Sequence, residues 1–182
     1  MKTKKIIVLV GPSGSGKTSI GEMLEKKSIP RLVTTTTRSS REGEREGVDY
    51  YFRDYSEMKM DDFVEQTVYN ENRYGLTKAE IQSMLEKYNI VHVSLDKQGA
   101  EALKKVYPNE SFIVFVEITE NEMIERMNKR GDSKKEIEER VAFAQKTKEL
   151  LPPENVDLKI RNINIEDSAQ MIIDHLTQKM NE

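Results

Sequence analysis

One short segment near the start of the chain restricts its fold more than any other feature. Residues 11–18 read GPSGSGKT and fit the pattern G-x-x-x-x-G-K-[ST] at every fixed position. An apolar, β-branched run, Lys5–Val10, comes directly before the segment, and a helical pattern over residues 17–27 follows it. A strand, a glycine-rich loop and a helix in this order predict a phosphate-binding loop in an α/β domain rather than an ordinary Gly/Ser turn.

The chemistry of such a loop explains its composition. Glycines permit the backbone angles that turn several N–H groups inward around phosphate oxygens, and the positive end of the following helix adds to the attraction. Lys17 is expected to reach the β- and γ-phosphate oxygens of ATP, and the Thr18 hydroxyl to ligate Mg²⁺. The loop residues expected to bind ATP are Gly11, Pro12, Ser13, Gly14, Ser15, Gly16, Lys17 and Thr18.

Short apolar runs rich in Val and Ile recur along the chain, as expected for strands that are buried on both faces. They cover residues 5–10, 31–33, 90–93, 112–116 and 156–160. Helical patterns lie between them, over residues 17–27, 77–87, 97–107, 119–130, 133–150 and 166–179. This alternation predicts an α/β fold in which a parallel sheet of the P-loop NTPase type is flanked by helices.

Three of the predicted helices open with a capping box, in which the side chains of the first and fourth residues satisfy each other's backbone donors. The pairs are Thr77 with Glu80, Thr119 with Glu122, and Ser133 with Glu136.

Two regions interrupt the alternation of strands and helices. Residues 34–74 are polar and contain alternating segments at 48–52 and 63–69, which predicts a small α+β insert with antiparallel strands. Residues 126–140 are densely charged and join two helices at Gly131, which is typical of a mobile flap.

The composition is that of a single ordinary domain. The chain has 182 residues, of which 36% are hydrophobic and 34% charged, and its formal net charge is −3. This balance gives no reason to expect binding to nucleic acid or to an anionic membrane. The sequence contains no cysteine, which excludes disulfides and thiolate metal sites. The first apolar run is shorter than the apolar region of a signal peptide, so the expected location is the cytoplasm.

The insert carries a candidate site for a second anion. Arg38 and Arg41 are close enough in sequence to converge on one phosphate, and arginine forks match phosphate oxygens in a bidentate way. Hydroxyls of Thr34 and Tyr50 could complete such a cradle. By composition alone, a polar edge strand with solvated charges is the favoured interpretation of the segment.

The order of residues in several segments decides between these interpretations, because it resembles that of guanylate kinases. Residues 34–52 contain a Ser/Thr-rich turn, two arginines, Gly-Glu and Gly-x-Asp-Tyr-x-Phe, as in the acceptor-binding segment of that family. Residues 72–75 are similar to its Tyr-Gly turn, and residues 95–99 to its Asp-x-Gln-Gly motif. Further similar segments are 62–65, 126–131 with Glu136 and Arg140, and 161–162. The resemblance runs from about residue 5 to the last helix.

The resemblance implies a role for individual residues. Glu65 is expected to accept hydrogen bonds from the guanine N1–H and amino group. The residues implied in GMP binding are Thr34, Arg38, Arg41, Glu44, Tyr50, Glu65, Tyr74 and Asp96. Those implied in catalysis are Lys17, Arg38, Arg126, Arg130 and Arg140, and Asn162 is implied to lie near the adenine of ATP. The family's fold implies a P-loop core (1–33, 81–124 and 145–182), a nucleoside-monophosphate insert (34–80) and a lid (125–144).

The implied activity is transfer of the γ-phosphoryl group of ATP to GMP or dGMP, with Mg²⁺, giving ADP and GDP. Two positions depart from the family pattern: Leu76 stands where a Ser or Thr is usual, and Ser94 where an Asp is usual. Leu76 is expected to leave one polar atom of guanine without a partner. The departures leave open another phosphorylated acceptor, either a different nucleoside monophosphate or a ribose phosphate. A non-catalytic guanylate-kinase-like interaction module is a further alternative. His92 and His175 are expected to have no role in the reaction.

Overall fold

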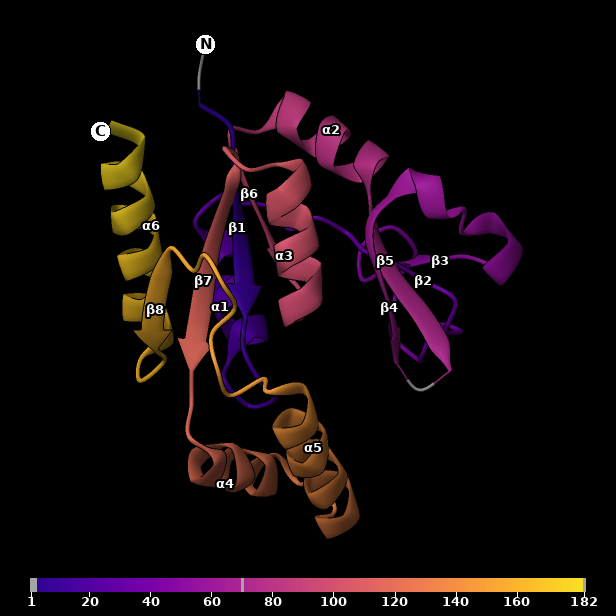
Figure 1. Cartoon of the computed structure of the whole chain (residues 1–182), viewed down its shortest axis with the longest axis vertical. Helices are drawn as coiled ribbons and strands as arrows, with labels where there is room; N and C mark the ends of the chain where they lie inside the picture. Colours follow the sequence, from indigo (N-terminus) through magenta and orange to yellow (C-terminus); the bar gives the residue numbers. More distant parts are fainter. Residues whose placement is uncertain (1–2, 70, 182) are drawn as a thin grey trace.

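A parallel four-stranded sheet forms the centre of the computed structural model, which describes residues 3–69 and 71–181 (Figure 1). In spatial order its strands are β6 (Ile90–Ser94), β1 (Lys5–Val10), β7 (Ser111–Glu117) and β8 (Leu158–Arg161). Each neighbouring pair runs parallel. The predicted α/β fold class is therefore confirmed.

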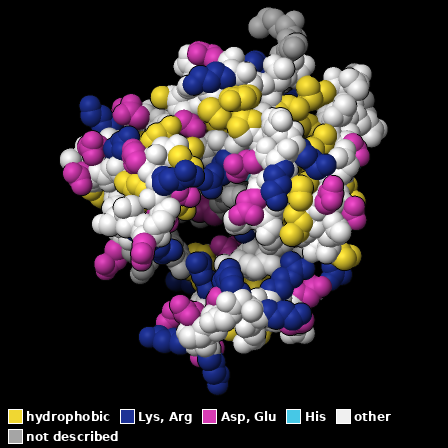
Figure 2. Space-filling model, turned by 180° about the vertical axis from the view of Figure 1, so that it is seen from behind, with side chains coloured by type: hydrophobic (Ala, Val, Ile, Leu, Met, Phe, Trp, Pro, Cys, Tyr) yellow, Lys and Arg dark blue, Asp and Glu magenta, His cyan; other side chains and the backbone are white. Residues whose placement is uncertain are grey.

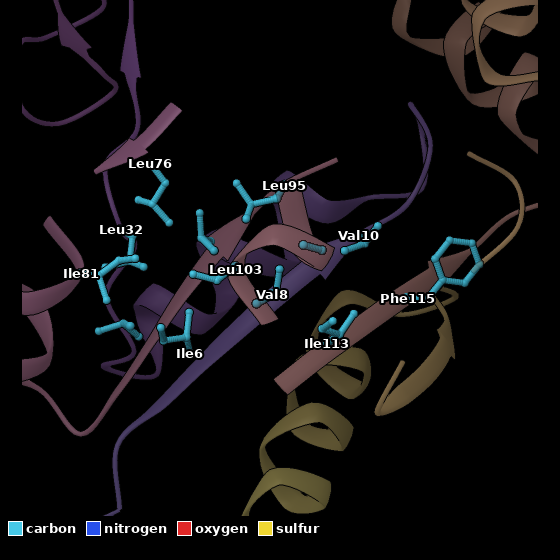
Figure 3. Close-up of a cluster of buried hydrophobic side chains, with 13 residues drawn as sticks. Ile6, Val8, Val10, Leu32, Leu76, Ile81, Leu95, Leu103, Ile113 and Phe115 are labelled. Carbon is cyan, nitrogen blue, oxygen red and sulfur yellow. The ribbon is translucent and has the colours of Figure 1, made fainter. Parts of the chain in front are cut away.

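Helices cover both faces of this sheet, and the alternation of side chains along β1 shows why. Ile6, Val8 and Val10 pack into one cluster with α2 (Lys78–Lys87) and α3 (Lys97–Val106), part of which is drawn in Figure 3. Ile7 and Leu9 point to the opposite face and pack against α1 (Lys17–Lys26) and α6 (Ile165–Asn181). Because every one of these β1 side chains is almost completely buried, the strand reads as a continuous apolar run.

The prediction of a fifth strand in the parallel sheet, at residues 31–33, is wrong. Only Arg31 pairs with the sheet, through an isolated bridge to His92. The Leu32 N–H donates to the His92 carbonyl at 2.8 Å, and the pairing with β6 does not continue beyond it. The Val33 N–H points away from β6, because N–H groups alternate sides along an extended chain, and it donates to Glu80 Oε1 at 2.9 Å. A side-chain carboxylate thus holds the chain from its outer side where it leaves the sheet.

A second four-stranded sheet lies beside the core (Figure 1). Its order is β3 (Tyr51–Phe52), β2 (Thr35–Thr36), β5 (Asn72–Thr77) and β4 (Phe63–Tyr69), and two 3₁₀ turns, Tyr55–Glu57 and Met60–Asp62, precede β4. The prediction of antiparallel strands holds for β2 with β5 and for β4 with β5, but β2 and β3 run parallel. We call this unit the acceptor sheet.

Two local predictions for the acceptor sheet are also wrong. The strand expected at 48–52 is reduced to β3, because the Asp49 carboxylate accepts from the Arg45 N–H at 2.8 Å and holds the preceding residues in a turn. The Tyr-Gly turn expected at 72–75 is part of β5. Gly75 is needed there for a different reason: a Cβ at this position would lie 2.5 Å from Phe63 Cδ1 on β4.

Two helices project from the end of the parallel sheet: α4 (Glu120–Arg130) and α5 (Lys134–Thr147) (Figure 1). Both begin with the predicted capping boxes, and they pack together through a small cluster of apolar residues, namely Met123, Met127, Ile137 and Ala144. The predicted helix ran to residue 150, but α5 ends at Thr147. It ends there because Lys148 adopts a left-handed conformation with φ 56°. Among the described residues, no helix has the length and apolarity needed to cross a membrane.

Candidate active site

The glycine-rich segment forms a loop between β1 and α1, as the motif predicts. Gly16 has φ 96°, and a Cβ there would lie 2.0 Å from Asn162 Nδ2. A Cβ at Gly11 would lie 2.6 Å from the Val116 carbonyl oxygen on the neighbouring strand β7. The loop is therefore packed so closely against its surroundings that glycine is required at both positions.

Lys17, the first residue of α1, is turned back onto this loop. Its ammonium donates to the Gly11 carbonyl and, at 3.0 Å, to the Pro12 carbonyl. Burial lowers the pKa of Lys17 to about 8, while Glu149 acts in the opposite direction and Arg140 in the same one. The next side chain, Thr18, is exposed at the N-terminal turn of α1.

Two residues predicted at the active site support the loop from the other side. Arg126 donates to the Gly14 carbonyl at 3.0 Å and to the Asn162 carbonyl at 3.0 Å. Asn162 is buried, and its amide donates to the Ser15 carbonyl at 3.3 Å while its oxygen accepts from Ser168. The structure thus gives Arg126 and the Asn162 side chain a supporting position behind the loop, and the expected contact with adenine stays a prediction.

An open cleft of about 400 Å³ lies between the acceptor sheet, β6 and α5. All eight residues implied in acceptor binding line it: Thr34, Arg38, Arg41, Glu44, Tyr50, Glu65, Tyr74 and Asp96. They come from segments that are up to about 60 residues apart in the sequence. The fold therefore brings together a set that the sequence pattern could only assemble through a family resemblance.

One wall of the cleft is an ordered group of charges and aromatic rings. Arg38 forms a bidentate pair with Glu44, with N–O distances of 2.9 and 2.7 Å, and its guanidinium lies 5.4 Å from the centre of the Tyr50 ring. The Tyr50 and Tyr74 rings meet edge to face at 6.0 Å. Glu44 also accepts from the Arg41 backbone N–H at 2.7 Å. These hydrogen bonds keep the pKa of Glu44 below its usual range and hold the Arg38 fork in position.

A carboxylate, Glu65, also lines the cleft. Glu65 stands on β4, opposite Leu76 of β5, where the ladder is irregular. A Cβ built on Gly99 would lie 3.1 Å from Glu65 Oε2 and 3.2 Å from Asp96 Oδ1, so the two acids flank the same glycine. Burial and, to a lesser degree, the charge of Asp96 raise the pKa of Glu65 to about 7, against the effect of a hydrogen bond from the Leu76 backbone. Asp96 is also the N-cap of α3, accepting from the Gly99 N–H at 2.7 Å.

The two departures from the family pattern turn out to differ in kind. Leu76 has no exposed surface and packs with Leu32, Ile81 and Leu95 in the core (Figure 3). Its side chain is not among the described residues that line the cleft, so the expectation that it faces the acceptor base is wrong. It results from reading the segment as a turn, whereas β5 directs this side chain inward. Ser94, by contrast, is exposed and lines the cleft.

The three lid arginines are not brought to one place. Arg140, on α5, lines the cleft and lies near Lys17, whereas Arg126 contacts the loop. Arg130 forms an ion pair with Asp132 at an exposed position and is absent from the lining of the cleft as far as the structure describes it. In Figure 2 the molecule is hollowed above the α4–α5 projection, and Lys and Arg side chains gather along the lower rim.

Sequence reasoning missed several residues of the cleft, among them Thr67, Val68, Phe143 and Glu149. Glu149 follows the end of α5 and lies near both Lys17 and Arg140. Burial raises its pKa, and the two cations oppose this effect. Its position depends on the left-handed residue before it, and the sequence carries no motif that announces this conformation.

His92 lies in a smaller cavity beside the cleft, with Thr18, Glu25 and Ser94 on the walls. Its side chain is 1% exposed, and no described group hydrogen-bonds either ring nitrogen; the nearest carboxylate, Glu25, is 3.7 Å away. Burial lowers the pKa of His92 to about 4. A Cβ on Gly21 of α1 would lie only 3.0 Å from the ring, so the imidazole is packed directly under the helix.

Comparisons with known proteins agree with this geometry. The family model for guanylate kinase matches residues 3–179. The guanylate kinase of Helicobacter pylori is 37% identical over 177 residues, covering 92% of this chain and 84% of the relative. That of Fusobacterium nucleatum is 32% identical over 179 residues, covering 95% and 96%. The crystal structure of guanylate kinase from Anaplasma phagocytophilum is 24% identical, covers 100% of this chain and 89% of its own, and superimposes with a TM-score of 0.74.

Proposed function

The chain belongs to the guanylate kinase family and is therefore an ATP:GMP phosphotransferase, and we propose that the loop of residues 11–18 and the adjoining cleft are its donor and acceptor sites. One observation carries the assignment of the acceptor site. An arginine–tyrosine wall and a partly buried carboxylate line the same cleft. A nucleoside monophosphate offers a matching group to each, a phosphate dianion to the arginines and the hydrogen-bond donors of its base to the carboxylate.

The phosphate of GMP would bind at the arginine–tyrosine wall. Arg38 and Arg41 both line the cleft. The two terminal nitrogens of Arg38 are held by Glu44, and its remaining N–H groups would meet the phosphate. Bidentate contacts between guanidinium groups and phosphate are strong and directional. The Tyr50 and Tyr74 hydroxyls and Thr34 would complete the cradle, so that the phosphate lies on the side of the cleft nearest the phosphate loop.

The guanine base would bind at Glu65. Its ionised carboxylate accepts two hydrogen bonds, and guanine offers adjacent N1–H and N2–H donors that adenine lacks. Asp96 would support this end of the cleft. Since a carboxylate left facing an unpaired base edge is costly, this contact selects guanine more strongly than shape alone.

Transfer needs no strong base, because the acceptor phosphate is already an anionic nucleophile. The protein has to bring two polyanions together, align them and exclude water. Lys17 would neutralise charge on the transferring group from the loop side, and Arg140 would do so from α5, since Arg140 lines the cleft and lies near Lys17. Arg126 would act on this reaction through the loop that it supports.

The residues around Thr18 fit the magnesium ion that usually accompanies ATP. The exposed Thr18 hydroxyl shares a cavity with the carboxylates of Glu22, Glu25 and Asp49. These carboxylates are not placed to hold a metal ion by themselves, since no such group of three or more occurs among the described residues. An ion at Thr18 would be held chiefly by phosphate oxygens and water. When bound, Mg²⁺ would withdraw charge from the β- and γ-phosphates. Thr18 is the protein residue that would ligate it.

A substrate screen tests the proposed function. A coupled assay for ADP formation, with ATP as donor, compares GMP, dGMP, AMP, CMP, UMP and a ribose phosphate. We expect the highest kcat/KM with GMP, and GDP should be found as the product. The family match does not favour the alternatives, another acceptor or a non-catalytic module. A preference for AMP or a ribose phosphate would reject the guanine assignment, and no turnover with any acceptor would support the module. The cytoplasm stays the expected location.

A further inference from the structure

Glu80 does not make the capping contact that the sequence predicts for it. Thr77 caps α2 as expected, accepting from the Glu80 N–H at 3.1 Å. The Glu80 carboxylate, however, does not return to the backbone of Thr77. Its Oε1 accepts from the Val33 N–H at 2.9 Å, and its Oε2 accepts from the Tyr51 hydroxyl at 3.1 Å.

These two contacts join the places where the chain passes between the core and the acceptor sheet. The chain leaves the core after Leu32, whose N–H is bonded to β6, and enters the acceptor sheet at β2. It returns to the core from β5 through the first turn of α2, which carries Glu80. One carboxylate therefore links the outgoing connection, the returning connection and strand β3.

The partners of Glu80 are direct neighbours of residues that line the cleft. Val33 precedes Thr34, whose carbonyl accepts from the Tyr51 N–H at 2.9 Å. Tyr51 follows Tyr50, whose ring lies beside Arg38 and Tyr74. A shift of the Glu80 contacts would move Thr34 and Tyr50 together. The phosphate loop joins β1 to α1, and no hydrogen bond that the structure describes links it to Glu80, Val33 or Tyr51.

The chemistry of the site indicates that these contacts are specific. Glu80 is 9% exposed, and it forms no ion pair with any residue that the structure describes. Both of its oxygens accept from neutral donors, so the carboxylate depends on the position of these donors for its stability in a buried place. A buried acid that is held only by such contacts favours one arrangement of the three segments over the alternatives.

We propose that Glu80 is a positioning residue that fixes the orientation of the acceptor sheet relative to the phosphate loop and so sets the affinity for the acceptor nucleotide. This inference rests on the proposed function, because it takes the cleft to be the GMP site. Glu80 would not touch either substrate. It would act through Tyr51 on Tyr50, and through Val33 on Thr34.

The test compares Glu80→Ala, Glu80→Gln and Tyr51→Phe with Glu86→Ala, a control at an exposed position on the same helix. Kd and KM are measured separately for ATP and for GMP, together with kcat and the thermal unfolding midpoint. We expect Glu80→Ala to raise the Kd and KM for GMP about tenfold or more, since small displacements of positioning groups have effects of this size. Values for ATP should stay within about twofold of those of the control.

The other variants separate positioning from general damage. Glu80→Gln keeps an acceptor for the Val33 N–H and should recover most of the GMP affinity. Tyr51→Phe removes one contact and should have a smaller effect, and its combination with Glu80→Ala should be less than additive, because both remove the same hydrogen bond. If Glu80→Ala does not fold, Glu80→Gln and Tyr51→Phe carry the test.

Two results would overturn the inference. One is that the folded variants bind GMP as tightly as the Glu86→Ala control. The other is that ATP and GMP affinities fall by equal factors, which would indicate a loosened domain. Failure of the proposed function looks different, because in that case the wild-type protein itself does not phosphorylate GMP.

Discussion

The phosphate loop and the acceptor cleft are adjacent, but they are built from different parts of protein chemistry. The loop is formed by backbone groups whose geometry depends on glycines packed against β7 and Asn162. The cleft is formed by side chains from the short strands of the acceptor sheet, from β6 and from α5. In the loop, the backbone groups are positioned by the conformation of consecutive residues. In the cleft, the side chains are positioned by hydrogen bonds and ion pairs between distant segments.

This difference has a consequence for how each site tolerates change. The loop has few alternatives, because its backbone conformation and its lysine act as one unit. In the cleft, several side chains share the binding of the substrate, and some of them are held in place by others, as Arg38 is by Glu44. We therefore expect single substitutions to affect the loop more severely than the cleft, and to affect different kinetic constants.

The largest effect is expected for Lys17→Ala. Removal of one preorganised cationic contact to the transferring group should cost about 3–4 kcal/mol of transition-state stabilisation. This loss would lower kcat roughly a hundred- to thousand-fold. The fold should persist, because the hydrogen bonds of Lys17 that the structure describes go to carbonyls of the loop itself. The measurement is single-turnover phosphoryl transfer, with Lys26→Ala, an exposed position on the same helix, as the control. Near-normal turnover in a folded Lys17→Ala protein is incompatible with the donor site described above.

A large effect on stability, rather than on kinetics, is expected for Leu76→Ser. The side chain is fully buried in the core beneath the acceptor sheet. Loss of its packing and burial of a hydroxyl should lower the free energy of unfolding by about 3 kcal/mol. Leu76→Met keeps the volume and should cost less than about 1.5 kcal/mol. Chemical denaturation measures both. If Leu76→Ser instead improved GMP use without loss of stability, the side chain would face the base after all.

A smaller effect is expected for Arg38→Ala, and it should be confined to the acceptor. Loss of the guanidinium should weaken GMP binding by about 2 kcal/mol, which corresponds to a roughly 30-fold higher KM for GMP. The KM for ATP should change little. Arg53→Ala is the matched control, because Arg53 also pairs with a glutamate in the acceptor sheet but is more exposed, at 38% against 14% for the Arg38 side chain. An increase in the KM for ATP alone would place Arg38 at the donor site instead.

The smallest effect concerns the pH dependence of GMP binding. Glu65 has a pKa raised to about 7, and the guanine donors bind its ionised form. As the pH rises through 7 the ionised fraction increases, so GMP affinity should increase about tenfold between pH 6 and pH 8. The phosphate of GMP also titrates, near pH 6. Glu65→Gln is the control, because the pH dependence of GMP binding that remains in this variant comes from the phosphate of GMP and not from residue 65.

Titration calorimetry at several pH values checks this prediction. Glu65→Gln should also weaken GMP binding at pH 8 by about 1–3 kcal/mol, since a charge-assisted contact becomes neutral and partly mismatched. Identical pH profiles for the wild type and the variant would show that Glu65 does not meet the base.

The sequence predicted the donor side of this protein better than the acceptor side, and the reason is physical. The loop and β1 depend on local spacing and on burial, both of which are visible in consecutive residues. The position of the chain at Val33 depends on a hydrogen bond to Glu80, which is 47 residues away in the sequence. In the same way, the inward direction of Leu76 depends on its pairing with β4, and the place of Glu149 on one left-handed residue. A linear pattern does not contain such contacts.

The partly buried position of Lys17 has a consequence for covalent chemistry. With a pKa of about 8, roughly a tenth of this amine is unprotonated at pH 7, compared with well under a thousandth of an ordinary surface lysine. Only the neutral amine is a nucleophile. Of the lysines that the structure describes, Lys17 is therefore the one that a mildly electrophilic acylating reagent should modify first at neutral pH, provided that the reagent is small enough to enter the loop. ATP should protect it, which makes this residue a natural anchor for a covalent inhibitor directed at the donor site.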